Sequence, residues 1–145
     1  MFCSGGKGGK GKHGVGLTVC NNIVSMKGCS SEPIKNRMMK VRLNLSVKSN
    51  AVTAVVAYAP TMVASEEDKS RLWGELSESA KAVPKQDHLF LLMDAIARMG
   101  TRDQGGRGKC SKVLGPFGRD VLNGYGERLL RLAEQEELSL VNTFF

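Results

Sequence analysis

A single carboxylate ends the most apolar stretch of the chain. Residues 89–93 (LFLLM) are apolar without alternation, and Asp94 follows them directly. A continuous apolar run of this length is typical of a strand that is buried on both faces of an α/β sheet. Open α/β sheets place functional groups just outside the carboxyl ends of such strands, so Asp94 is a candidate catalytic carboxylate. Asp is also a common turn residue, and the pattern alone leaves both interpretations open.

A tract rich in glycine and lysine near the N-terminus has nearly the spacing of a phosphate-binding loop. Four residues separate Gly6 from Gly11, and Lys12 follows, but His13 stands where Ser or Thr would contact magnesium. Such a loop also needs a preceding strand, and the three residues before Ser4 are too few to supply one. We therefore interpret residues 1–12 as a flexible, basic Gly/Lys-rich tail, with a surface turn within the glycine- and lysine-rich tract as the alternative.

The thiol and imidazole side chains are spaced too irregularly to form a zinc motif. They are Cys3, Cys20, Cys29, Cys110, His13 and His88. Reduced cysteines in an intracellular compartment are the expectation, and the nucleus is one candidate. No apolar run approaches the roughly 20 residues of a membrane span, and residues 1–7 lack the apolar core of a secretory signal.

Cations exceed anions in this chain of 145 residues, which has a formal net charge of +7. That balance favours a polyanionic partner such as nucleic acid. The long loop that follows Asp94 carries several of the cations, and its candidate nucleic-acid contacts are Arg98, Arg102, Arg107 and Lys109. A basic loop that is simply solvated is the alternative. The sequence does not define the oligomeric state.

The elements that would position these groups follow one another in an α/β order. We expect strands at 15–20, 39–47, 51–58, 88–93 and 138–143, and helices at about 65–82 and 125–137. Residues 39–47 alternate between apolar and polar side chains, which is typical of a half-solvated strand. This strand and the one at 51–58 should form an antiparallel hairpin. Ser65 and Asn123 are the expected N-terminal caps of the two helices. The stretch between 20 and 39 is expected to be a polar loop, and pairing should stop at Pro60.

Several segments taken together resemble the endonuclease/exonuclease/phosphatase superfamily. They are HGVGL at 13–17, the hairpin that ends in YAPT at 58–61, the strand that ends in Asp94, GPFGRDVLNGYGERLL at 115–130 and LSLVNTFF at 138–145. The pattern looks like the endonuclease domain of LINE-type (non-LTR) retrotransposons and like the craniofacial development protein 2-like proteins. The resemblance covers nearly the whole chain from His13 onward.

The resemblance implies a fold, an activity and two site residues. The fold is a four-layer α/β sandwich of two packed, mostly antiparallel sheets flanked by helices, of which residues 13–145 would be a part lacking its N- and C-terminal portions. The activity is Mg²⁺-dependent hydrolysis of phosphodiester bonds in DNA. Asp94 matches the Asp of the family motif Gly-Asp-x-Asn-Ala, which activates or orients the attacking water. Tyr58 matches the tyrosine of Tyr-x-Pro, whose hydroxyl lies near the scissile phosphate.

The chain also departs from the family pattern. Met93 replaces the motif glycine, Ile96 replaces its asparagine, and Thr61 replaces the Asn that often follows Tyr-x-Pro. Loss of one preorganised hydrogen-bond donor commonly slows a reaction by roughly 10²–10³-fold. The family's metal-binding Glu would lie upstream of this segment, and its further Asp and its Asp-His pair downstream.

Three interpretations follow from these departures. The first is a truncated relative of retrotransposon origin that is essentially inactive and is not expected to hold Mg²⁺ by itself. The second is a non-catalytic, basic nucleic-acid-binding module. The third is an active enzyme that a partner chain completes. Whether the chain is an enzyme is left open by its residues.

Overall fold

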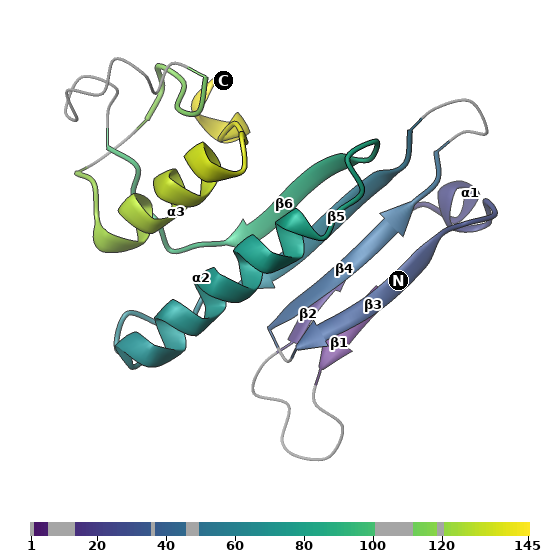
Figure 1. Cartoon of the computed structure of the whole chain (residues 1–145), viewed down its shortest axis with the longest axis horizontal. Coiled ribbons are helices and arrows are strands. Elements are labelled where there is room, and N and C mark those ends of the chain that lie inside the picture. The colour runs from purple at the N-terminus through teal and green to yellow at the C-terminus, as the bar shows by residue number, and fades with distance from the viewer. Residues whose placement is uncertain (1, 6–13, 36, 46–49, 101–111, 119–120) are drawn as a thin grey trace. The chain divides into compact units, whose positions relative to one another are not determined.

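The computed structural model describes residues 2–5, 14–35, 37–45, 50–100, 112–118 and 121–145 (Figure 1). The chain divides into two compact units. The first comprises Met1–Pro60 and Glu78–Asp94, and the second comprises Thr61–Ser77 and Ala95–Phe145. In the described part of the chain, no helix is long and apolar enough to cross a membrane.

A four-stranded mixed sheet forms the centre of the first unit. Its elements are β1 (Phe2–Gly5), β2 (Gly14–Leu17), α1 (Asn21–Val24), β3 (Ser30–Lys35), β4 (Met38–Leu43), β5 (Val52–Tyr58) and β6 (His88–Asp94). The sheet has the order β3-β4-β5-β6, in which only the β5–β6 pair is parallel. Parallel neighbours need a crossover connection, and helix α2 (Glu66–Lys81) supplies it. The predicted hairpin of β4 and β5 is confirmed.

Strand β4 alternates between two packed faces. Met39, Val41 and Leu43 are buried against a ribbon formed by the antiparallel strands β1 and β2, which lies along one face of the sheet (Figure 1). The opposite face of β4 carries Met38, whose sulfur accepts a hydrogen bond from Ser79 Oγ in the last turns of α2 at 3.4 Å. The alternation predicted for this strand is therefore confirmed, because a period of two separates the two faces of a sheet. The expectation that its second face is solvated is wrong at Met38, which is fully buried.

Two strands of this unit occur where the sequence predicted none. β3 occupies part of the stretch expected to be a polar loop. Its side chains are mostly exposed, and it forms one edge of the sheet, where a residue such as Pro33 is tolerated. β1 lies within the range 1–12 that was expected to be a flexible tail, because Phe2–Gly5 pairs with Gly14–Leu17. Residues 6–12 lie outside the described residues.

The prediction that the apolar strand before Asp94 is buried on both faces is wrong. β6 is an edge strand of the described sheet, and its burial alternates along its length. Phe90 is 49% exposed and Leu92 is 41% exposed. Both lie opposite residues of β5, Ala54 and Val56, so they share the face that the ribbon covers elsewhere. A continuous apolar run does not distinguish a central strand from an edge strand of this kind.

The second unit contains the first three turns of α2, helix α3 (Gly124–Gln135) and the 3₁₀ helix η2 (Val141–Thr143). Both expected caps are confirmed: Ser65 Oγ accepts from Asp68 N at 3.1 Å, and Asn123 Oδ1 accepts from Gly126 N at 2.8 Å. The predicted strand at 138–143 is wrong, since only one isolated bridge forms there, between Leu114 and Leu140. Strand propensity needs a partner strand to be realised, and η2 forms instead.

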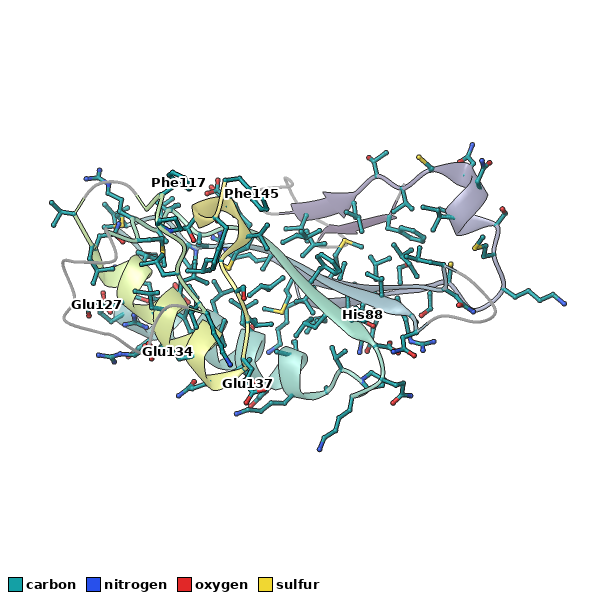
Figure 2. All side chains as sticks on the ribbon, turned by 90° about the horizontal axis from the view of Figure 1, so that it is seen from above. His88, Phe117, Glu127, Glu134, Glu137 and Phe145 are labelled. Atoms are coloured by element: carbon teal, nitrogen blue, oxygen red, sulfur yellow. The ribbon has the colours of Figure 1, made fainter. Side chains whose placement is uncertain are left out.

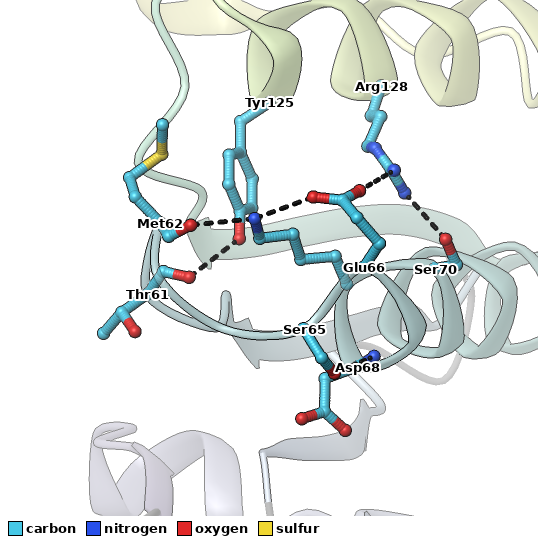
Figure 3. Close-up of polar contacts among 9 residues, drawn as sticks. Thr61, Met62, Ser65, Glu66, Asp68, Ser70, Tyr125 and Arg128 are labelled. Carbon is cyan, nitrogen blue, oxygen red and sulfur yellow. Dashed lines mark hydrogen bonds and ion pairs between the residues drawn. The ribbon is translucent and has the colours of Figure 1, made fainter.

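Polar contacts join α2 to α3 inside this unit (Figure 3). Arg128 Nη2 lies 2.9 Å from Glu66 Oε2, and Lys69 Nζ lies 2.9 Å from the other carboxylate oxygen. The hydrogen bond from Lys69 lowers the pKa of Glu66, although burial partly opposes this effect. Tyr125 packs its ring 6.2 Å from that of Trp73 and donates its hydroxyl to Thr61 O at 3.3 Å. These contacts fix the two helices against each other.

Candidate functional site

Three candidate side chains form one row across the end of the sheet in the first unit. Tyr58 and Asp94 are register partners, since they end the parallel strands β5 and β6 together. Tyr58 N donates to Arg37 O at 3.0 Å, which continues the β4–β5 pairing by one residue. Residues at matching positions of neighbouring strands project from the same face. Arg37, Tyr58 and Asp94 therefore lie side by side on three adjacent chain segments.

The row places a cation beside a phenol. The Arg37 guanidinium carbon lies 5.7 Å from the centroid of the Tyr58 ring, within the distance of a cation–π contact. Asp94 is exposed and Tyr58 is partly buried. Sequence reasoning identified Asp94 and Tyr58 and missed Arg37. The predicted hairpin indicates Arg37 once its register is known, because antiparallel pairing puts the residue before the first strand opposite the end of the second.

The backbone around Asp94 defines where the sheet ends. Ala59 N donates to Asp94 O at 3.0 Å, and Ala59 is fully buried. Pro60 follows and has no N–H, so the ladder stops there as predicted. Asp94 is consequently the last paired residue of its strand, which places its carboxylate at the boundary between the sheet and the next loop.

A partly buried ion pair holds the other end of β6, with the Arg42 side chain 39% exposed. Asp87, immediately before β6, accepts hydrogen bonds from Arg42 Nε at 2.6 Å, from Arg42 Nη2 at 3.0 Å and from Thr53 Oγ1 at 2.8 Å. The Asp87 side chain is fully buried. The bonds from Arg42 lower the pKa of Asp87, burial opposes them, and Thr53 adds to the lowering. The bidentate pair joins β4, β5 and the start of β6.

In the second unit, Asn123 fixes the turn that follows Asp94 in the chain. Its Nδ2 donates to Ile96 O at 3.2 Å, and its Oδ1 accepts from Arg98 N at 3.0 Å while also capping α3. Its backbone N donates to Arg98 O at 3.2 Å. Ile96 has a φ of +49°, in the left-handed region that β-branched residues rarely adopt. Sequence reasoning identified Asn123 as a helix cap but missed its contacts with this turn.

Of the four basic residues predicted to contact nucleic acid, Arg98 lies among the described residues and the other three do not. Arg98 is exposed, and its backbone is held by Asn123. Arg102, Arg107 and Lys109 lie outside the described residues. Close packing fixes the backbone of Arg98 further, because a Cβ added to Gly126 would lie 2.0 Å from Arg98 O. This loop therefore presents at least one cation from a fixed backbone.

The row of Arg37, Tyr58 and Asp94 has groups suited to a phosphate ester. A guanidinium binds phosphate oxygens, a phenol donates a hydrogen bond, and a carboxylate can orient a water molecule. Magnesium prefers several oxygen ligands. Within the described ranges, no group of three or more His, Cys, Asp or Glu side chains lies close enough to hold a metal ion.

These features define an α/β protein with a carboxylate, a phenol and a guanidinium at one end of its main sheet. No family model matches the chain, and no solved structure matches it. The chain is similar to craniofacial development protein 2 of Bos taurus, with 31% identity over 136 residues that cover 92% of this chain and 21% of that protein. It is 29% identical over 135 residues to the protein of the same name from Tragulus javanicus, covering 92% of this chain and 22% of that protein.

The expected resemblance to craniofacial development protein 2-like proteins is thus confirmed at about 30% identity. The chain spans about a fifth of the length of these curated relatives. The similarity extends over both compact units, since it covers 92% of the chain.

Proposed function

We propose that this chain is part of a divergent protein of the endonuclease/exonuclease/phosphatase type, of retrotransposon origin, in which a Mg²⁺-dependent DNA phosphodiesterase site has become impaired. The register of Tyr58 with Asp94 supports this most directly. The two residues were assigned from separate motifs, 36 positions apart in the sequence by their numbers (94 − 58). Their meeting at one end of a parallel strand pair is the arrangement that a shared site requires.

Ile96 is the reason to propose impairment. It stands two residues after Asp94, where the family motif has Asn, and its side chain has no hydrogen-bonding group. The corresponding loss of a donor near a developing negative charge is expected to cost roughly 10²–10³ in rate.

The wider fold proposed here is the two-sheet sandwich of that superfamily. The β1–β2 ribbon would be the beginning of the second sheet, because it packs on the apolar face of β4. Phe90 and Leu92 continue that apolar face onto β6 and are substantially exposed. Further strands beside the ribbon would cover them, as the inner face of a sandwich requires.

Binding of DNA phosphates at the row of Arg37, Tyr58 and Asp94 can be tested by measuring DNA affinity. If phosphates approach the row, Asp94→Asn removes a repelling charge and should raise the affinity for duplex DNA several-fold at low salt. Arg37→Gln should lower the affinity and reduce the slope of its salt dependence by about one. The matched control is Glu127→Gln, which makes the same charge change at an exposed position of α3. Equal effects of Asp94→Asn and Glu127→Gln on the affinity for duplex DNA would contradict binding of phosphates at the row.

A second candidate function is a non-catalytic nucleic-acid-binding module. The exposed Arg98 side chain on a backbone held by Asn123 favours it, because a fixed cation loses less entropy on binding. A steep fall in DNA affinity with rising salt, without any nicking, is the expected behaviour. Affinity that does not depend on salt would exclude it.

A further inference from the structure

Two segments of the second unit form a closely bonded platform beside helix α3. Leu140 N donates to Val113 O at 2.8 Å, and Phe117 N donates to Thr143 O at 2.9 Å. The buried Thr143 hydroxyl accepts from Gly115 N at 2.7 Å. A Cβ added to Gly115 would lie 2.1 Å from Thr143 O, so the two backbones approach as closely as glycine allows. The platform is therefore held by backbone contacts and does not depend on the side chains that project from it.

Aromatic side chains of these two segments and the basic Arg98 of the loop after Asp94 line a cavity of about 670 Å³. Phe117 is 62% exposed and Phe145 is 92% exposed, and both line the cavity. Figure 2 shows the two phenyl rings close together, with Glu127 and Glu134 projecting from α3 on another side of this unit. Arg98 and Asn142 also line the cavity. The cavity thus combines aromatic faces, a guanidinium and an amide, away from the acidic side of the helix.

Two phenyl rings and a guanidinium that line one cavity are groups that bind an aromatic, anionic ligand. The volume lies within the range of about 300–1,000 Å³ that is usual for sites of small molecules. Bases of single-stranded nucleic acid stack on aromatic rings while Arg side chains contact their phosphates. An amide such as that of Asn142 can pair with the polar edge of a base. The net charge of +7 favours a polyanion over a neutral partner.

We propose that this cavity binds unpaired nucleotides of a single-stranded nucleic acid, with a base stacked on Phe117 or Phe145 and a phosphate beside Arg98. This inference rests on the proposal that the protein acts on nucleic acid, and it adds a site in the second unit that recognises unpaired bases. A stacked base contributes free energy whatever its identity, because every base has an aromatic face. The site therefore selects single strands over duplexes and shows little sequence preference.

The test is fluorescence anisotropy of the full chain with a labelled oligodeoxythymidine of about twenty nucleotides, which exceeds the usual site size. Phe117→Ala and Phe145→Ala should each weaken binding roughly 5- to 100-fold, and Phe117→Tyr should retain it, because stacking depends on the ring. Arg98→Gln should weaken binding and lower the salt slope by about one. An oligouridine of the same length distinguishes DNA from RNA as the preferred strand.

Val63→Ala is the matched control, since Val63 is an apolar residue of the same unit with 94% exposure. Thermal unfolding should be nearly unchanged in the two Phe variants, because both side chains are largely exposed. Failure to bind the oligonucleotide, or equal affinity of Phe117→Ala, Phe145→Ala and Val63→Ala, would overturn the proposal. A duplex bound with the same dependence on Phe117 would also overturn it. Effects of Asp94→Asn on duplex DNA that persist in either case would leave the proposed function standing.

Discussion

Asn123 holds Ile96 in a backbone conformation that suits asparagine better than isoleucine. The Asn123 amide donates to Ile96 O at 3.2 Å, and Ile96 has a φ of +49°. The left-handed conformation costs roughly 1–2 kcal/mol for a residue with a Cβ, and Asn tolerates it because its short side chain can bond locally. The backbone at position 96 therefore favours Asn over Ile, independently of any catalytic role.

Ile96→Asn should therefore stabilise the protein. We expect the free energy of unfolding to rise by about 0.5–1 kcal/mol, because backbone strain is relieved and Ile96 is only partly buried, at 37% exposure. Urea unfolding followed by circular dichroism measures the change. Ile96→Val is the control, since it keeps the β-branch and should bring no gain. Destabilisation by Ile96→Asn would show that the conformation is not strained.

Gly126→Ala should destabilise the second unit. The added Cβ would lie 2.0 Å from Arg98 O and 2.9 Å from Leu122 Cδ1, so the backbone after Asp94 or helix α3 must move. We expect a loss of about 1–3 kcal/mol in the free energy of unfolding.

Gly124→Ala in the same helix is the matched control for Gly126→Ala. No atom lies within 4 Å of its added Cβ, and the higher helix propensity of Ala should stabilise by up to about 1 kcal/mol. A similar effect of the two substitutions in thermal or urea unfolding would contradict the close packing of Gly126 against Arg98.

The ion pair at the start of β6 should make stability depend on acid pH. The pKa of Asp87 is lowered in the folded protein from its ordinary value of 3.8. Its contribution is therefore complete above that value and is lost as the pH falls through the lower pKa of the folded state. Asp87→Asn should lower the free energy of unfolding by about 1–3 kcal/mol at neutral pH, because Arg42 and Thr53 would no longer bond to a charged carboxylate.

Unfolding measured from pH 7 to pH 2 checks this dependence. The difference in the free energy of unfolding between the wild type and Asp87→Asn should be constant above about pH 5 and shrink below about pH 4. Glu78→Gln, which changes an exposed carboxylate of α2, should leave the wild-type profile nearly unchanged. A difference that is equally large at pH 2 would show that the Asp87 charge is not involved.

The local elements of the fold were largely predictable from the sequence. The alternation in β4, the cap at Ser65 and the stop at Pro60 each depend on a few neighbouring residues, and all three are confirmed. β3 could not be predicted, because an exposed edge strand does not need an apolar pattern. The exposure of Phe90 and Leu92 could not be predicted either, since it depends on what lies beside β6 in the sheet.

The candidate site was predictable only in part. Asp94 was predicted because it ends a recognisable strand, Tyr58 was predicted from the Tyr-x-Pro motif, and the sheet brings the two into register. Arg37 was missed because its place beside Tyr58 depends on the exact register of the β4–β5 hairpin. The strain at Ile96 and the contacts of Asn123 depend on a meeting of segments 27 residues apart, which no local pattern reveals.

We infer that the row of Arg37, Tyr58 and Asp94 at the end of β5 and β6 is an impaired phosphodiesterase site. The most direct test is nicking of supercoiled plasmid DNA by the highly purified chain in the presence of Mg²⁺, with Asp94→Ala purified in parallel. We expect that nicking by the wild type does not exceed that of Asp94→Ala, because the Ile96 side chain cannot donate the hydrogen bond that an Asn would donate at this position. Mg²⁺-dependent nicking by the wild type that disappears in Asp94→Ala would contradict it.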